Sequence, residues 1–103
     1  MIIASLAIFP TSEGVSVSEY VKEAIKVIES SGLKSVTGGM NTTIEAPDLE
    51  TLFHVIERSH KKIADMGAKR IHIDLNVDHR LDTDATIESK LSFDSMVASV
   101  SKR

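Results

Sequence analysis

The chain has 103 residues, of which 42% are hydrophobic and 26% charged, and its formal net charge at pH 7 is −3. A chain of this length has room for one hydrophobic core, so we expect a single domain over residues 1–103. The negative charge argues against nucleic acid as a partner, because phosphate binding needs a concentrated positive surface. The absence of cysteine excludes disulfide bonds and thiolate chemistry, and it fits a cytoplasmic location.

The N-terminal run of residues 1–10 is apolar and ends at Pro10. It is too short to cross a membrane, and it lacks the basic lead and the cleavage site of a signal peptide. Residues 2–9 have high β-propensity, and a proline cannot continue a central ladder, so we expect a buried strand here. We therefore expect no membrane partner.

Two helices are predicted from the helical spacing of apolar residues. The first begins at a capping box formed by Ser16 and Glu19 and ends before Gly32. The second begins after Asp48, which is a good N-cap, and ends at Gly67. The apolar stripe predicted for the second helix consists of Leu49, Leu52, Phe53, Ile56, His60 and Ile63. We interpret His60 as a core histidine.

Three further strands and a C-terminal helix follow from the remaining patterns. Residues 33–38 and 41–46 form two short strands joined around Gly38 and Gly39. Residues 69–78 alternate between apolar and polar side chains, as a half-buried strand does. The C-terminal helix is predicted from Ile87, Leu91, Met96, Val97 and Val100.

The two halves of the chain match each other. Ile28, Gly32 and Lys34 align with Ile63, Gly67 and Lys69, so a helix–glycine–strand unit occurs twice, each time after a strand. Right-handed crossovers then place both helices on one face of the sheet. The sequence thus predicts an α+β, ferredoxin-like βαββαβ fold. Its four-stranded antiparallel sheet carries two helices on one face, and a C-terminal helix is added.

The other face of this sheet is left uncovered by the two helices. Alternation assigns Val36 to the helix side together with Ile2, Ala4, Leu6, Ile8, Ile44 and the apolar residues of 71–77. The uncovered face then carries Ile3, Ser5, Ala7, Phe9, Ser35, Thr37, Thr43, Glu45, His72, Asp74 and Asn76. Its apolar residues predict a cover, either a second copy of the chain or the C-terminal helix folded back. RNA is not expected there, because that face has only one aromatic residue for stacking.

The hairpin over residues 38–45 is the most suggestive segment for ligand binding. Its glycines let the backbone approach a ligand closely, and its asparagine, threonine and glutamate side chains supply donors and acceptors. The alternative interpretation is a plain hairpin whose threonines serve β-propensity. Both interpretations remain open at the level of residue types.

Catalytic, metal and cofactor sites are not predicted. The chain shows no nucleophile–base pairing, phosphate loop or nucleophile elbow. His72 and Asp74 share a strand face, but the spacing supplies no third metal ligand. An enzyme using His60 and Glu45 as acid and base is the least favoured hypothesis.

Several short motifs resemble the thiamine-binding protein family, which has a YkoF-like ferredoxin fold. They are Phe9-Pro10, Ser18-x-Tyr20-Val21, Ser31-Gly32-Leu33-Lys34 and Asn41-Thr42-Thr43-Ile44-Glu45, and the resemblance runs to about Leu91. It implies a homo-oligomer, a dimer or a tetramer of two dimers, that binds thiamine or its hydroxymethylpyrimidine moiety without turning it over. By position in the motifs, it implies Thr11, Asn41, Thr42, Thr43 and Glu45 as ligand-binding residues.

The leading hypothesis is therefore a non-catalytic carrier, buffer or sensor of thiamine or a related pyrimidine. The alternative is an oligomeric regulatory or scaffold protein with a different small ligand. Alternation places Thr42 on the opposite sheet face from Thr43 and Glu45, so we do not expect all of these side chains to touch one ligand.

Overall fold

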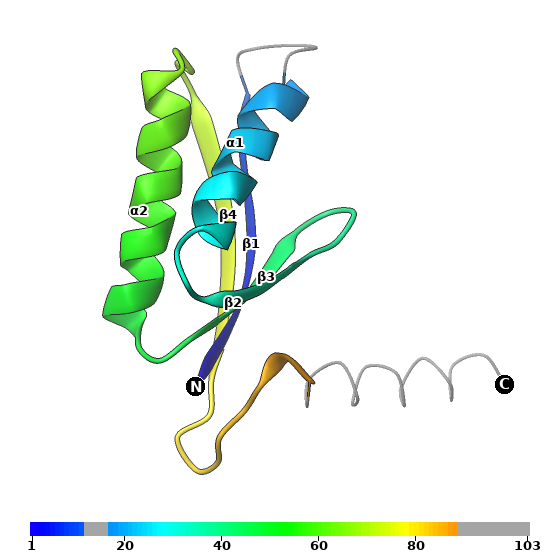
Figure 1. Cartoon of the computed structure of the whole chain (residues 1–103), viewed down its shortest axis with the longest axis vertical. Coiled ribbons are helices and arrows are strands. Elements are labelled where there is room, and N and C mark those ends of the chain that lie inside the picture. Colours follow the sequence, from blue (N-terminus) through cyan, green and yellow to red (C-terminus); the bar gives the residue numbers. More distant parts are fainter. Residues whose placement is uncertain (12–16, 89–103) are drawn as a thin grey trace, which may run out of the picture.

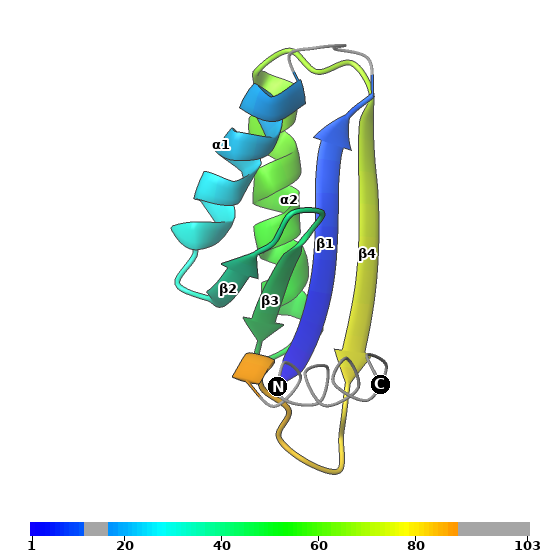
Figure 2. The same ribbon diagram turned by 90° about the vertical axis from the view of Figure 1, so that its right-hand side faces the viewer.

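The computed structural model describes residues 1–11 and 17–88. The elements in chain order are β1 (Ile2–Pro10), α1 (Val17–Glu29), β2 (Lys34–Thr37), β3 (Thr42–Ala46), α2 (Leu49–Asp65) and β4 (Ile71–His79). The strands form one antiparallel sheet in the order β2-β3-β1-β4. Both helices lie on one side of it (Figures 1 and 2). The predicted βαββαβ arrangement is confirmed, whereas most of the predicted C-terminal helix lies outside the described residues.

The main core lies between the sheet and the two helices. Alternate residues of β1 face the helices, as predicted, because successive side chains of a strand point to opposite faces. The buried core residues are Ile2, Ala4, Leu6, Ile8, Ala24, Ile28, Ile44, Ala46, Leu52, Val55, Ile56 and Ile63. Gly32 and Gly67 follow the two helices with positive φ angles of 87° and 105°, which is the left-handed conformation predicted for helix ends. Within the described residues no helix is long and apolar enough to cross a membrane.

The buried stripe of α2 differs from the predicted one. Leu49 and Phe53 are 44% and 48% exposed, and His60 is exposed as well. The prediction of a core histidine was therefore wrong. Ser59 is buried in its place, and its Oγ donates to the carbonyl oxygen of Val55 at 3.0 Å. A serine can be buried on a helix because its own helix supplies the hydrogen-bond acceptor.

The side chains of β2 also face the opposite way from the prediction. Val36 pairs with Thr43 and is 44% exposed on the face away from the helices. The positions predicted for that face, Ser35 and Thr37, lie on the helix side instead. The hairpin turn decides this, because the N–H of Gly38 donates to the carbonyl of Asn41 at 2.8 Å and fixes the register of both strands.

The chain itself covers one end of the face away from the helices. Ile3 is 5% exposed and packs against Ala85 and Ile87. The N–H of Ile87 donates to Glu45 Oε2 at 3.3 Å. Residues 85–87 therefore provide part of the cover that was predicted for this face. At the other end of β1, Phe9 contacts His72 with ring centroids 5.1 Å apart.

The β2–β3 hairpin is too short to pair with the whole of β1. β4 pairs with β1 from Ile2 to Pro10, whereas β3 pairs only with residues Ile2 to Leu6. Within the described chain, residues 7–10 of β1 thus have a strand neighbour on one side only. Figure 1 shows the hairpin tip turning away from β1 at this point.

Candidate functional site

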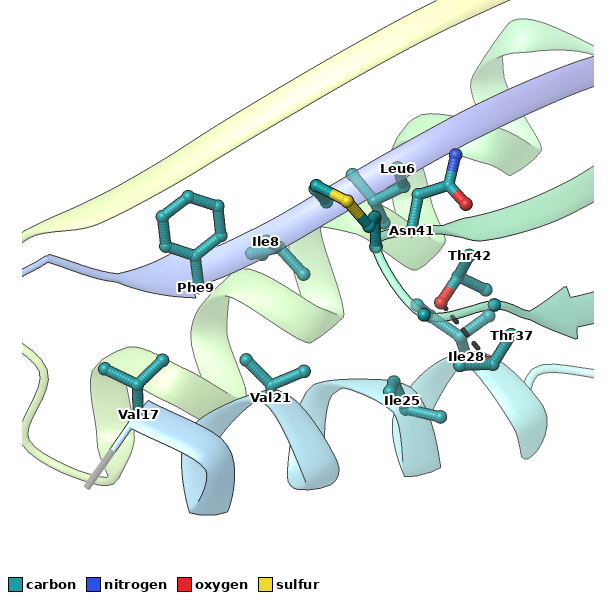
Figure 3. A pocket seen from close by; sticks show the side chains of 14 residues that line it. Leu6, Ile8, Phe9, Val17, Val21, Ile25, Ile28, Thr37, Asn41 and Thr42 are labelled. Carbon is teal, nitrogen blue, oxygen red and sulfur yellow. Dashed lines mark hydrogen bonds between the residues drawn. The ribbon is translucent and has the colours of Figure 1, made fainter. Parts of the chain in front are cut away.

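A cavity of about 290 Å³ lies where the hairpin leaves β1, and α1 forms its floor (Figure 3). Most of its wall is apolar and comes from three separate elements. The lining residues are Leu6, Ala7, Ile8, Phe9, Val17, Val21, Ile25, Ile28, Thr37, Gly38, Gly39, Met40, Asn41 and Thr42. An apolar cleft with a few convergent polar groups is the usual form of a small-molecule site.

The polar groups of the cavity gather at its hairpin end. Thr42 is only 5% exposed, and its Oγ1 lies 3.3 Å from Thr37 Oγ1 (Figure 3). Asn41 Nδ2 donates to Ser5 Oγ, so the Asn41 side chain turns toward the face away from the helices, and Asn41 borders both this cavity and the sheet face. The two threonine hydroxyls can therefore present both donors and acceptors to a ring bound among the apolar side chains.

The side chains that line the cavity are uncharged among the described residues. None of the described residues that line it carries a charge. No group of three or more potential metal ligands occurs within residues 1–11 and 17–88. The described wall therefore offers no charged side chain that would pair with a charged group of a ligand.

The structure brings together two of the five residues that the family resemblance implied for the ligand. Asn41 and Thr42 line the cavity. Thr43 lies on the face away from the helices, and Glu45 is engaged with the N–H of Ile87. Thr11 is exposed at the far end of β1, five residues beyond Leu6, which is about 17 Å along a strand.

A second hollow of about 340 Å³ contains Thr43. It is lined by Ile3, Ala4, Ser5, Asn41, Thr43, Asn76, Val77 and Asp78, which belong to the sheet and the adjoining turn. Because no helix contributes to its wall, this hollow is a depression in the sheet face. The cavity beside α1 offers a ring far more apolar contact, since α1 and the strands enclose it from different sides.

The structure separates the two members of the proposed acid–base pair. Glu45 pairs with Ile3 and Lys34 on the face away from the helices. His60 is an exposed residue of α2, which packs on the other face. A pair that is separated by the sheet cannot share a proton through one bridging water.

Sequence reasoning missed part of the cavity wall. Val17, Val21 and Ile25 belong to the apolar spacing that predicted the first helix, but they are only half-buried and line the cavity. Thr37 was placed on the wrong face. The signal that could have found the cavity is the difference in length between β1 and β3, with nine and five residues.

Comparison with known proteins identifies the family. A family profile described as "Thiamine-binding protein" matches residues 4–93. The chain belongs to this family. A UPF0045 protein of Methanocaldococcus jannaschii is 36% identical over 90 residues, which are 87% of this chain and 88% of that protein.

Solved structures of relatives show the same fold. The crystal structure of a hypothetical protein from Methanocaldococcus jannaschii has a TM-score of 0.82 at 34% identity, covering 91% of this chain and 95% of that one. A structure from Thermotoga maritima is described as that of a candidate thiamine biosynthesis/salvage protein. It has a TM-score of 0.78 at 28% identity and covers 88% of this chain and 95% of that one. The fold of this chain is thus shared with these two solved structures.

Proposed function

We propose that this protein binds thiamine or a related hydroxymethylpyrimidine compound in the cavity between α1, β1 and the hairpin. It does so without catalysis, as a carrier, buffer or sensor. The observation that supports this proposal is that Asn41 and Thr42, two residues of the family motif, meet in one apolar cavity. Membership of the thiamine-binding family and the description of the Thermotoga maritima relative favour thiamine as the ligand.

The chemistry of the cavity suits an aminopyrimidine. Its ring nitrogens accept hydrogen bonds and its exocyclic amine donates them, and a hydroxyl group can satisfy either. The apolar side chains of α1 can pack against the flat faces of the ring. A volume of about 290 Å³ lies at the lower end of the range of small-molecule sites, which fits a ligand of one or two rings.

Two adjacent threonines provide a matched test of the location. Thr42→Val keeps the side-chain volume but removes a hydroxyl from the cavity, and we expect it to weaken thiamine binding about tenfold, as loss of one hydrogen bond does. Thr43→Val makes the same change on the other sheet face, and we expect no change in affinity. Isothermal titration calorimetry with thiamine measures both.

The outcomes of this titration separate the possibilities. If Thr43→Val weakens binding and Thr42→Val does not, the ligand occupies the sheet-face hollow instead. If the wild-type protein shows neither binding heat nor a thermal shift with millimolar thiamine, the proposed function is wrong.

We also propose that the protein is a homo-oligomer. The exposed apolar residue Val36 and the partly exposed Phe9 lie on the face away from the helices. Residues 85–87 cover only the Ile3 end of that face. A regulatory or scaffold oligomer with another small ligand is the second candidate function, and the same surface supports it.

A further inference from the structure

The free edge of β1 forms one wall of the cavity beside α1. Leu6 and Ile8 line the cavity from the helix side of the sheet, and Ala7 and Phe9 line it from the other side. Successive side chains of a strand point to opposite faces. A single cavity bounded by both sets is therefore bounded by the edge of the strand, where the main-chain N–H and C=O groups lie.

The hydrogen bonds to β4 show which main-chain groups face this cavity. The N–H of Thr11 donates to the carbonyl oxygen of Arg70 at 2.9 Å, on the β4 side of β1. Along an antiparallel strand the main-chain groups of successive residues point alternately to the two sides. Phe9 therefore bonds toward β4 like Thr11, and Ile8 directs its N–H and C=O to the opposite side. The main-chain groups of Pro10 point to the same side as those of Ile8. Because proline has no N–H to donate, it is expected at such an unpaired edge.

The ladder on that opposite side ends before it reaches Ile8. Leu6 pairs with Thr42, which is the last partner that β3 offers to β1. The position opposite Ile8 would be Met40, but the hairpin has already turned there and Met40 is 92% exposed. Among the described residues, no backbone hydrogen bond joins Ile8 to the hairpin tip. The N–H and C=O of Ile8 thus face the cavity.

We propose that the main-chain N–H and C=O of Ile8 bind the donor–acceptor edge of the ligand ring. This inference rests on the proposed function and adds which main-chain groups recognise the ligand. Backbone polar groups at a buried position require partners, and an amino group next to a ring nitrogen supplies an acceptor and a donor side by side. The ring then takes the place that another residue of β3 would occupy.

This arrangement defines the class of ligand. It selects a flat heterocycle that carries an amino group beside an acceptor nitrogen. A 4-oxo analogue has the reverse pattern, since its ring nitrogen donates and its oxygen accepts. If such an analogue binds in the same orientation, the N–H of Ile8 faces a donor and its C=O faces an acceptor. A site that binds its ligand through hydrogen bonds strongly rejects a ligand with mismatched groups.

Replacing one amide by an ester tests the role of Ile8 with its side chain unchanged. In the full-length chain assembled by chemical ligation, an ester at Ile8 removes its N–H. The matched control is an ester at Ala4, which does not line this cavity and which loses an N–H that bonds to β3. Each ester also weakens the preceding carbonyl, which bonds to β4 in both cases, so the two variants differ only in the N–H that is lost.

We expect the Ile8 ester to bind thiamine about tenfold more weakly than the wild type in a calorimetric titration. The Ala4 ester should keep the wild-type affinity and unfold at a lower urea concentration than the Ile8 ester. The wild type should also bind the 4-oxo analogue of thiamine at least about tenfold more weakly than thiamine.

Equal affinity of the wild type and the Ile8 ester for thiamine overturns the inference while leaving the proposed function intact. Equal affinity of the wild type for thiamine and its 4-oxo analogue also overturns it. If the wild type does not bind thiamine, the proposed function itself fails.

Discussion

Asp48 caps α2 with its side chain. Its Oδ1 accepts the N–H of Thr51 at 2.7 Å, and this hydrogen bond lowers the pKa of the Asp48 carboxyl below its ordinary value. The negative charge also lies at the positive end of the helix dipole. The ionised form therefore stabilises the start of the helix.

The lowered pKa of Asp48 predicts how stability depends on pH. Its contribution is present at any pH above the pKa of an unfolded aspartate, about 3.9, and is lost as the pH falls through the lower folded-state pKa. We expect Asp48→Ala to lower the midpoint of thermal unfolding by a few degrees at neutral pH and by much less in strong acid. Asp48→Asn is the control, because it keeps an acceptor that does not titrate. An equal loss for Asp48→Ala at both pH values would contradict the role of the charge.

The exchange of roles between Ser59 and His60 shows the limit of prediction for single residues. The apolar residues of α2 can be grouped into two overlapping stripes that lie about one residue apart. The stripe predicted from the sequence included His60 and left out Val55. The sheet and α1 select the stripe with Val55, Ser59 and Ile63. Polarity alone could not identify Ser59 as buried, because its acceptor is the Val55 carbonyl of the same helix.

At the scale of elements, residues 85–88 are held against the sheet by Glu45 and by Lys34. Glu45 accepts the N–H of Ile87, and Lys34 forms an ion pair with Glu88. The Glu45 contact is partly buried, whereas both partners of the ion pair are half or more exposed. An exposed pair contributes little to stability. Glu45 is therefore the stronger attachment of this segment.

Substituting Glu45 distinguishes attachment from ligand binding. We expect Glu45→Ala to speed hydrogen exchange of the Ile87 amide about tenfold, since one hydrogen bond is lost. We also expect it to leave the affinity for thiamine unchanged. Glu88→Ala serves as the control and should alter neither quantity appreciably. A loss of thiamine affinity in Glu45→Ala, with Ile87 exchange unchanged, would make Glu45 a ligand residue as the family resemblance implies.

The cavity itself is a consequence of element lengths. β1 has nine residues and β3 has five, so the hairpin cannot follow β1 to its end. The turn at Gly38 and Asn41 then fixes the register and sets Thr37 and Thr42 on the cavity side. The strand lengths were readable in the sequence, but the direction in which the hairpin tip turns was not.

At the scale of the whole molecule, the face away from the helices predicts self-association. We expect light scattering to give a mass of at least twice the 11.2 kDa of one chain. Phe9→Lys should reduce this mass because it places a charge on that face. Phe53→Lys is the matched control, because Phe53 is a half-exposed residue of α2, which covers the other face. A monomer at high concentration would exclude the oligomer, and an effect of Phe53→Lys alone would move the interface to the helices.

The sequence by itself determined the order of the elements from β1 to β4, the ends of both helices at Gly32 and Gly67, and the βαββαβ fold. These features depend on local physics: helical or alternating spacing, a capping aspartate, and glycines that adopt positive φ angles at helix ends. The family motif predicted that the hairpin contributes to ligand binding. Short-range patterns were sufficient for all of this.

Only the tertiary structure decided which of those residues share a site. Thr42 and Thr43 are neighbours in the chain, but the sheet separates them, and Thr42 joins the half-buried side chains of α1. The open position of Ile8 likewise depends on where β3 stops pairing with β1. These outcomes depend on the pairing register and on packing between distant segments, which no spacing within one segment contains.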